Sequence, residues 1–225
     1  MHYSIERICH ERPGYSQQRH NMAQWRQTGI GEHIMHKRVQ HYLIERSIAL
    51  IGMAASGKTK LGKKLAGHLR CDFVDTDDVI VANFNAKNLQ EVVDLLSPSE
   101  FAATEEAAIL ETVKRARTPT IIATGGSACY STKAMEFLAQ ETLLVHLWSP
   151  RDVIIKRIEE GPDRGLVCAP NETPGDLYDR RMPLYSRWAH RVVDTGQSRR
   201  KAARRLVTQL IEEGVITKAS APSRK

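Results

Sequence analysis

A glycine-rich segment between an apolar run and a helical pattern constrains the fold of this 225-residue chain most strongly. Residues 52–59 read Gly-Met-Ala-Ala-Ser-Gly-Lys-Thr and match G-x-x-x-x-G-K-[ST], directly after the apolar run at 48–51. Leucines at positions 61, 65 and 69 follow with helical spacing. This order predicts a phosphate-binding loop, whose backbone N–H groups and following helix N-terminus face phosphate oxygens. The alternative is a chance match in a turn rich in glycine and alanine.

The residues of this loop are candidate ligands of a nucleotide and its metal ion. Lys58 is expected to reach the β- and γ-phosphates as a point charge, and the Thr59 hydroxyl to ligate the Mg²⁺ that bridges them. The predicted nucleotide-binding residues are Gly52, Ala54, Ala55, Ser56, Gly57, Lys58, Thr59 and Lys60.

Apolar runs alternate with helical patterns from residue 47 onward, which is typical of a doubly wound α/β domain with a parallel sheet. Strands are predicted at residues 48–51, 73–75, 121–123, 143–147 and 191–194. Helices are predicted at residues 58–70, from 78 through most of the chain to 117, near 133–140 and at 151–159. A further helix is predicted to contain residues 177–187, and a terminal helix to run from about 200 to 213. The polar segment 161–175 is predicted to be a mobile loop.

The same pattern divides the chain into three parts. Residues 47–213 form the predicted domain, residues 214–225 a tail, and residues 1–46 an extension without sustained apolar periodicity. The extension lacks the apolar stretch of a secretory signal. Its arginines would suit an organelle transit peptide, although glutamates at positions 6, 11, 32 and 45 count against one.

Composition and charge favour a globular protein of the cytoplasm. Hydrophobic residues make up 41% of the chain and charged residues 26%, and no apolar run is long enough to span a bilayer. The cysteines are far apart and form no C-x-x-C pair, which argues against a zinc site or a disulfide framework. They are Cys9, Cys71, Cys129 and Cys168.

The net charge of +7 is concentrated at the two ends of the chain. Residues 1–46 carry +3 and residues 199–225 carry +6, whereas residues 47–198 carry −2. The basic run at 199–205 could bind RNA phosphates or an acidic partner, but we favour the solvated face of a terminal helix. We therefore expect no nucleic-acid partner.

Two aspartates follow the second predicted strand. Asp75 and Asp77 are two residues apart on an extended segment, so their side chains point the same way. One is expected to reach the Mg²⁺ shell and the other a substrate hydroxyl. The alternative is an N-cap for the helix predicted to begin near Asp78, but Asp78 itself can fill that role.

Glycines and a loop arginine complete the candidate site. Gly125, Gly126 and Ser127 follow the strand at 121–123, where bare backbone N–H groups can approach a ligand. Arg164, in the predicted mobile loop, is placed to meet the charge that develops during phosphoryl transfer. The alternative for Arg164 is an ordinary solvated charge.

The order and spacing of these motifs resemble shikimate kinase, within the nucleoside-monophosphate-kinase-like group of P-loop proteins. The resemblance covers about residues 46–213. It is carried by the phosphate loop, Phe73-Val74-Asp75-Thr76-Asp77, Glu100-Phe101, Gly125-Gly126, Asp163-Arg164, Arg181-Met182-Pro183-Leu184-Tyr185 and Val193-Asp194-Thr195.

The resemblance implies a three-layer fold with a central parallel sheet and a mobile lid loop, and ATP with Mg²⁺ as cofactors. It implies that Asp75 helps order the Mg²⁺ shell, while Asp77 binds the ring hydroxyls and orients or deprotonates the one attacked. Gly125, Gly126 and Ser127 would contact the substrate. Arg181 would hold the substrate carboxylate by a bidentate pair, Arg164 would close from the lid, and Arg157 would lie against the adenine.

Two positions depart from the family pattern. Ala102 stands where the family usually places a second arginine that clamps the substrate carboxylate, and Ser127 replaces the third glycine of Gly-Gly-Gly. Loss of that arginine would weaken substrate binding by roughly tenfold to more than a hundredfold. Lys114 and Arg115 are candidates to compensate for it.

The resulting prediction is an ATP-dependent kinase that phosphorylates the 3-hydroxyl of shikimate, with Lys58, Asp77 and Arg164 as catalytic residues. One alternative keeps the fold and phosphorylates another small hydroxy acid or polyol. A second is a non-catalytic relative that senses a nucleotide or metabolite. The family suggests a monomer.

Overall fold

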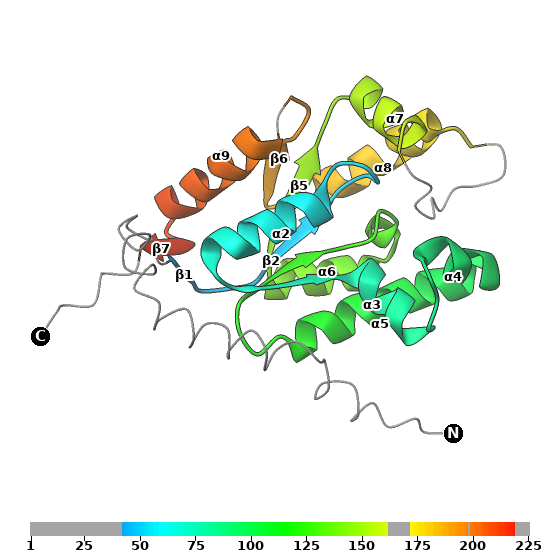
Figure 1. The fold of residues 1–225 in the computed structure, drawn as a ribbon, viewed down its shortest axis with the longest axis horizontal. Helices are drawn as coiled ribbons and strands as arrows, with labels where there is room; N and C mark the ends of the chain where they lie inside the picture. The colour runs from blue at the N-terminus through cyan, green and yellow to red at the C-terminus, as the bar shows by residue number, and fades with distance from the viewer. Residues whose placement is uncertain (1–41, 162–171, 198, 219–225) are drawn as a thin grey trace, which may run out of the picture. The chain divides into compact units, whose positions relative to one another are not determined.

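The computed structural model describes residues 42–161, 172–197 and 199–218, and its centre is a five-stranded parallel sheet with strand order β3-β4-β2-β5-β6 (Figure 1). The neighbouring strands of this sheet pair in parallel throughout. The strands are β2 (Ile48–Ile51), β3 (Asp72–Asp75), β4 (Thr120–Ala123), β5 (Leu143–Trp148) and β6 (Arg191–Asp194). The predicted α/β fold with a central parallel sheet is thus confirmed.

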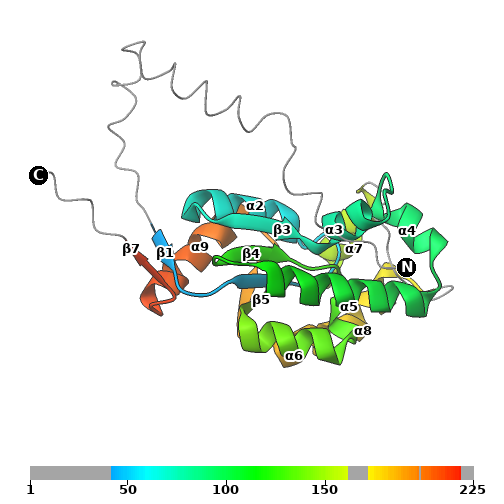
Figure 2. The same ribbon diagram turned by 90° about the horizontal axis from the view of Figure 1, so that it is seen from below.

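Helices cover both faces of this sheet and make the three layers visible in Figure 2. On one face, α2 (Lys58–Leu69) and α9 (Arg199–Glu212) pack against the strands. On the other face lie α5 (Pro98–Arg115), α6 (Thr132–Glu141), α7 (Arg151–Glu159) and α8 (Pro174–Trp188). Every residue of β2 and β4 is buried, because helices on both faces exclude water from the central strands.

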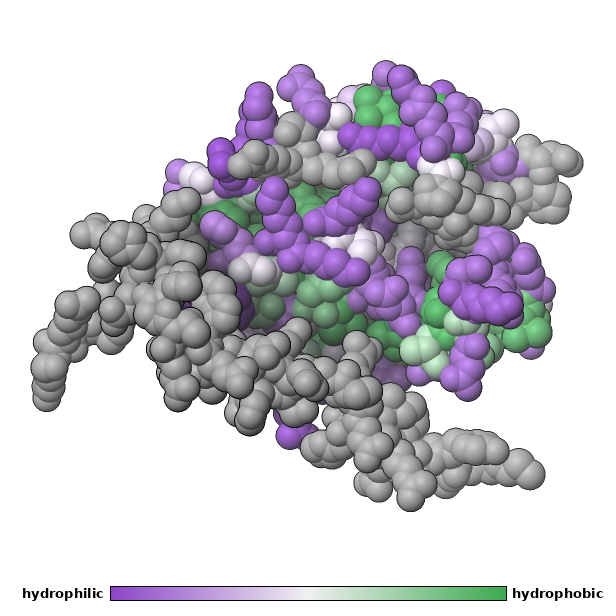
Figure 3. Space-filling view, in the orientation of Figure 1, coloured by the Kyte–Doolittle hydropathy of each residue, from purple (hydrophilic) through white to green (hydrophobic). Residues whose placement is uncertain are grey.

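A smaller hydrophobic cluster joins α3 (Thr76–Asn83) and α4 (Leu89–Leu95) to α5. Its buried members are Ile80, Val92, Phe101 and Ala108. On the face shown in Figure 3, most of the described residues are hydrophilic, and hydrophobic residues show between them around α2 and near α3 and α4. Among the described residues, no helix is long and apolar enough to cross a membrane.

Two helices begin earlier than the sequence predicted. Helix α3 starts at Thr76 rather than near Asp78, and its N-cap is Asp75, whose carboxylate accepts a hydrogen bond from the backbone N–H of Asp77 at 3.2 Å. The prediction that Asp78 caps this helix was therefore wrong. An N-cap side chain accepts a hydrogen bond from the backbone N–H two or three residues after it, and here that side chain is Asp75.

Helix α8 starts at Pro174, so the end of the predicted loop is helical. Thr173 and Asp176 form a reciprocal capping box, and Pro174 occupies the first helical turn, where a missing N–H costs nothing.

Two short strands and one turn of helix were not predicted. Strand β1 (Tyr42–Ile44) pairs antiparallel with β7 (Ile216–Lys218), which joins two distant parts of the chain in a separate two-stranded sheet. A 3₁₀ turn, η1 (Ala128–Tyr130), follows the glycines after β4. Three-residue elements carry too little periodicity to be recognised in a sequence.

Candidate active site

The phosphate loop between β2 and α2 contains three residues with positive φ. Gly52, Ala55 and Gly57 have φ of +140°, +62° and +100°. Such left-handed residues among right-handed ones make a concave nest of N–H groups that suits an anion. At Gly52 a side chain is excluded, because a Cβ would lie 2.7 Å from the backbone oxygen of Leu147 on β5.

Lys58 spans this loop from the first turn of α2. Its ammonium donates to the backbone oxygens of Gly52 at 2.7 Å and Met53 at 2.9 Å, and only 9% of the residue is exposed. Burial lowers the pKa of Lys58, while the nearby carboxylates of Asp77 and Asp75 raise it. The lysine thus brings a positive charge to the position where phosphates would enter.

Thr59 and Asp75 bring two oxygen ligands together beside this loop. The Thr59 hydroxyl donates to Oδ2 of Asp75 at 2.7 Å, and the Asp75 side chain is buried. Burial raises the pKa of Asp75, and the Thr59 hydrogen bond lowers it. A hydroxyl and a carboxylate are the hard oxygen donors that Mg²⁺ prefers, so this pair fits the expected ion.

No group of three or more His, Cys, Asp and Glu residues that could hold a metal ion occurs in the described part of the chain. Proteins commonly bind Mg²⁺ with one or two side chains, while water and phosphate oxygens supply the remaining ligands.

Asp77 lies next to Lys58 in the first turn of α3. Its Oδ1 is buried and makes no hydrogen bond. Burial raises the pKa of Asp77 to about 6, with a further contribution from the charge of Asp75, while Lys58 opposes the shift. An orphaned buried carboxylate oxygen with a pKa near neutrality is suited to accept a proton or hydrogen bond from a bound hydroxyl.

Gly125 and Gly126 follow β4 after Thr124 and lie close to Glu105, Asp77, Arg181 and the phosphate loop. A Cβ on Gly125 would overlap Oε1 of Glu105 and lie 2.9 Å from Oδ1 of Asp77. A Cβ on Gly126 would lie 3.2 Å from a terminal nitrogen of Arg181 and 3.3 Å from the backbone nitrogen of Ala54. The two glycines therefore bring two carboxylates, a guanidinium and the phosphate loop to one place.

Arg181 reaches this place from α8 and is 1% exposed. Its Nε donates to the Tyr130 hydroxyl at 3.2 Å, and its guanidinium lies 5.1 Å from the centre of the Tyr130 ring. The Tyr185 hydroxyl, one turn further along α8, donates to the backbone oxygen of Gly126. These contacts hold an arginine, the residue best suited to bind a carboxylate, beside the two glycines.

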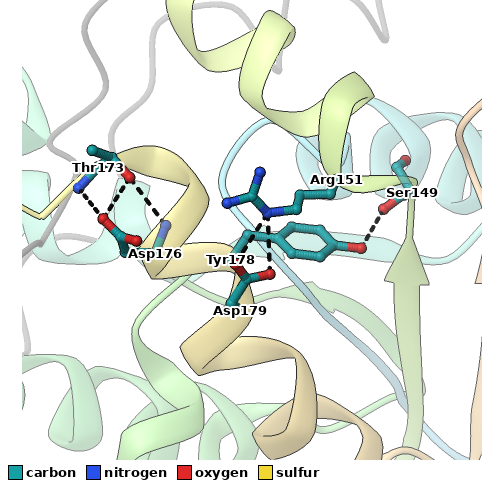
Figure 4. Close-up of polar contacts among 6 residues, drawn as sticks. All are labelled: Ser149, Arg151, Thr173, Asp176, Tyr178 and Asp179. Atoms are coloured by element: carbon teal, nitrogen blue, oxygen red, sulfur yellow. Dashed lines mark hydrogen bonds and ion pairs between the residues drawn. The ribbon is translucent and has the colours of Figure 1, made fainter.

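Helix α8 is attached to β5 and α7 through its N-terminal half, as Figure 4 shows. The Tyr178 hydroxyl donates to the backbone oxygen of Ser149 at 2.9 Å. Nε of Arg151 lies 3.1 Å from both carboxylate oxygens of Asp179. Because Arg181 follows Tyr178 by three residues and Asp179 by two, within the same turn of the helix, these contacts also set its position.

Arg157 occupies the far side of the phosphate loop. Its guanidinium donates to Oγ of Ser149 at 3.2 Å and to the backbone oxygens of Thr195 and Gly196, each at 3.0 Å. The Thr195 hydroxyl in turn donates to the backbone oxygen of Ser56 at 3.1 Å. Arg157 is thus connected to the phosphate loop through the segment that follows β6.

The structure brings together most of the predicted site residues. The exceptions are Lys60, whose side chain is exposed, and Arg164, which lies outside the described residues. Lys114 and Arg115 do not replace the missing arginine, because they are about 20 Å along α5 from Ala102 at 1.5 Å per residue. Arg115 instead pairs with Glu111 at 2.8 Å.

Glu105 is the main residue of the site that the sequence did not reveal. It is 4% exposed, and burial raises its pKa to about 7, while a hydrogen bond from Ser127 lowers it. The sequence did contain a sign that Glu105 is buried. Glu105 is four residues from Phe101 and four from Ile109, both buried, and a carboxylate in such an apolar stripe of a helix is unusual. Tyr130 carried no such signal.

Comparison with known proteins agrees with this geometry. The shikimate kinase family model matches residues 54–212. A shikimate kinase of Psychrobacter arcticus is 31% identical over 169 residues, which cover 74% of this chain and 88% of the relative.

Solved structures show the same similarity. Shikimate kinase from Acinetobacter baumannii in complex with shikimate has a TM-score of 0.67 and 27% identity, covering 76% of this chain and 94% of that chain. Shikimate kinase from Aquifex aeolicus has a TM-score of 0.64 and 21% identity, covers 75% of this chain and 98% of that chain, and supports the fold alone. The chain belongs to the shikimate kinase family, whose members are phosphotransferases that use ATP and Mg²⁺.

Proposed function

We propose that this chain transfers the γ-phosphoryl group of ATP to the 3-hydroxyl of shikimate. The observation that carries the proposal is the meeting of Asp77 and Arg181 at Gly125 and Gly126, beside the phosphate loop. A carboxylate that accepts a hydroxyl proton and an arginine that binds a carboxylate suit a small hydroxylated acid.

In the proposed reaction the acceptor hydroxyl oxygen forms a bond to the γ-phosphorus as the bond to the β–γ bridging oxygen breaks, which leaves ADP. Asp77 takes the hydroxyl proton, because its orphaned Oδ1 faces Gly125 and is ionised above its pKa of about 6. Lys58 leaves the backbone oxygens of Gly52 and Met53 to stabilise charge on the phosphates.

The remaining residues bind and orient. Thr59 and Asp75 would hold Mg²⁺, which supplies charge neutralisation on the phosphates when bound. The loop residues Gly52, Ala54, Ala55, Ser56 and Gly57 would bind phosphates through backbone N–H groups. Arg157 would lie against the adenine, Lys60 would contribute charge near the phosphates, and Arg164 would close over the transferred group.

We also propose the organisation and setting of the protein. Residues 47–213 would be the kinase domain with a lid at about 161–175. The predicted extension 1–46 and tail 214–225 would lie outside this domain, although their parts Tyr42–Ile44 and Ile216–Lys218 form the strands β1 and β7 that pair with each other. The protein would be a monomer of the cytoplasm, without a nucleic-acid or membrane partner. The concentration of positive charge at the two ends of the chain, with −2 between them, supports a kinase domain that does not bind nucleic acid.

A coupled assay of ADP release tests the reaction. Turnover should rise with shikimate and not with a panel of other hydroxylated acids. Lys58→Ala should lower the rate by about a hundredfold or more. Lys64→Ala, an exposed lysine of the same helix, is the matched control. Retained phosphorylation in Lys58→Ala would contradict the proposed site. Turnover only with another hydroxylated acid would show that shikimate is not the acceptor. Nucleotide binding without turnover would indicate a non-catalytic sensor.

A further inference from the structure

His146 is a buried polar residue that the proposed reaction does not use. It lies on β5, in register with Ile51, the residue directly before the phosphate loop. His146 is 1% exposed, and neither of its ring nitrogens has a hydrogen-bond partner among the described residues. Buried polar atoms are nearly always hydrogen-bonded, because a buried atom without a partner has lost its hydrogen bonds to water for nothing. The two nitrogens of His146 therefore call for a role beyond packing.

The His146 ring contacts both the acceptor side of the site and the phosphate loop. Its centre lies 5.0 Å from the centre of the Tyr185 ring, with 34° between the two planes. The Tyr185 hydroxyl already donates to the backbone oxygen of Gly126. At the phosphate loop, Cδ2 of His146 would lie 3.3 Å from a Cβ on Gly52. Nε2 is bonded to this carbon, so the ring brings a nitrogen close to Gly52.

The protonation state of His146 suits a hydrogen bond to a neutral oxygen. Burial and, to a lesser extent, the charge of Lys58 lower the pKa of His146 to about 4. The ring is therefore neutral near pH 7, where one of its nitrogens carries a proton and can donate while the other accepts.

Gly52 is the residue that loses a donor in the proposed reaction. Lys58 donates to the backbone oxygens of Gly52 and Met53, and both oxygens lose this donor when Lys58 turns toward the phosphates. The Met53 oxygen keeps the backbone N–H of Ser56 at 3.2 Å. For the Gly52 oxygen, the described part of the chain supplies no second donor. Gly52 is buried, so an oxygen left without a donor there would weaken nucleotide binding.

We propose that His146 is a positioning residue of the phosphate loop, which donates its ring N–H to the Gly52 backbone oxygen when Lys58 turns toward the phosphates. The inference rests on the proposed function only for this movement of Lys58. Because the exchange of donors accompanies nucleotide binding rather than phosphoryl transfer, it does not depend on which acceptor the enzyme uses.

Direct titration of the full chain with a non-hydrolysable ATP analogue and with AMP tests the exchange. His146→Phe keeps an aromatic ring against Tyr185 and removes both nitrogens. It should raise the Kd for the ATP analogue about tenfold, because the Gly52 oxygen then has no donor in the complex. The Kd for AMP should stay within about twofold of wild type, since AMP lacks the phosphates that draw Lys58 away. His146→Gln retains an N–H donor and should keep the Kd for the analogue within about threefold of wild type.

The same substitution should have the opposite effect on the protein without nucleotide. His146→Phe replaces two unpartnered buried nitrogens by carbon, so the urea concentration at the midpoint of unfolding should rise. A histidine that only fills space would give no such combination of greater stability and weaker ATP binding. A lower midpoint for His146→Phe, or an equal loss of affinity for AMP and the ATP analogue, would overturn the proposal.

The matched control is a histidine near the other end of β5 whose ring is hydrogen-bonded. Nδ1 of His190 accepts from the backbone N–H of Leu144 at 3.0 Å. His190→Phe removes this acceptor and should lower the midpoint of unfolding, while both Kd values stay within about twofold of wild type.

Lys58→Met separates this inference from the proposed function. It should weaken binding of the ATP analogue, and adding His146→Phe in this background should change the Kd by less than about twofold, because no donor is exchanged. If Lys58→Met binds the analogue as tightly as wild type, Lys58 does not reach the phosphates and both proposals fail. If Lys58→Met weakens binding and His146→Phe does not, only the role of His146 is wrong. The Ser56 hydroxyl is the other unpartnered group near Gly52, and a loss of affinity in Ser56→Ala but not in His146→Phe would also overturn that role.

Discussion

The Thr59 hydroxyl donates to the Asp75 carboxylate across 2.7 Å and so joins the first turn of α2 to the end of β3. Asp75 also caps α3 through the backbone N–H of Asp77 at 3.2 Å. One carboxylate therefore connects the proposed metal ligand Thr59 to the helix that carries Asp77. Asp75 thus links the nucleotide end of the proposed site to its acceptor end.

Thr59→Val should raise the Mg²⁺ concentration for half-maximal turnover by about tenfold or more, because it removes one oxygen ligand and the hydrogen bond that orients the other. A Mg²⁺ titration of ADP release measures this. Thr59→Ser, which keeps the hydroxyl, should restore most of the affinity. An unchanged Mg²⁺ requirement in Thr59→Val would contradict the proposed metal site.

The rate of transfer should depend on the ionisation of Asp77. Its pKa is raised to about 6, so the ionised form that accepts a proton predominates above that pH and is lost below it. We expect kcat/KM for shikimate to fall about tenfold per pH unit below about pH 6. Asp77→Asn should lower the rate by roughly 10²–10⁴-fold and remove this dependence. Exposed Asp78→Asn is the neighbouring control and should keep a pH dependence of the same form, moved slightly toward lower pH, because the charge of Asp78 is a minor cause of the raised pKa of Asp77.

Glu105→Gln should stabilise the protein at alkaline pH. Burial raises the pKa of Glu105 from 4.5 to about 7 in the folded protein. The wild-type protein therefore has its full free energy of unfolding below about pH 4.5, where Glu105 is protonated in the folded and the unfolded state. It loses the part that depends on this proton as pH rises through 7. The variant should exceed wild type above about pH 8 by up to about 3 kcal/mol, and the difference should vanish near pH 4. Urea unfolding at several pH values measures it.

Substitution of the adjacent Glu106 should change the stability in the opposite direction. Hydrogen bonds from Lys133 and Ser131 lower the pKa of Glu106, so its ionised form stabilises the folded state. Glu106→Gln should therefore lower stability near neutral pH. If both variants shifted stability in the same direction at alkaline pH, the buried environment assigned to Glu105 would be incorrect.

Tyr130→Phe should weaken acceptor binding without affecting the nucleotide. The substitution removes the hydroxyl that accepts from Nε of Arg181 at 3.2 Å but keeps the ring under the guanidinium. A neutral partner of this kind contributes about 0.5–1.5 kcal/mol, so the KM for shikimate should rise roughly twofold to tenfold. Tyr130→Ala removes the ring as well and should have a larger effect. Equal KM values for wild type and Tyr130→Ala would show that Tyr130 does not position Arg181.

Two neighbouring residues of α8 should differ in their contribution to stability. Tyr178→Phe leaves the buried backbone oxygen of Ser149 without its donor at 2.9 Å and should cost about 1–2 kcal/mol. Asp179→Ala breaks an ion pair whose side chains are 50% and 58% exposed and should cost less than about 1 kcal/mol. Thermal or urea unfolding distinguishes the two, and a larger loss from Asp179→Ala would reverse this ranking.

The parallel sheet was predictable because buried strands and amphipathic helices leave strong periodic patterns. All five strands of the sheet were predicted within one residue at each end, and α7 within its observed bounds. Helix starts were less predictable, because Asp75, Asp77 and Asp78 can all cap a helix and only the backbone path selects one. The strands β1 and β7 depend on pairing between residues far apart, which no local pattern encodes.

The sequence by itself determined the phosphate loop and the parallel sheet, because each depends on local spacing, whereas the proposed acceptor residue Arg181 came from the resemblance to a family. Only the tertiary structure decided which side chains meet. It placed Glu105 beside Asp77 at Gly125 and excluded Lys114 and Arg115 as substitutes for an arginine. Those relationships depend on the packing of α5 against the end of β4, and burial there, rather than residue type, raises the pKa of a glutamate to about 7.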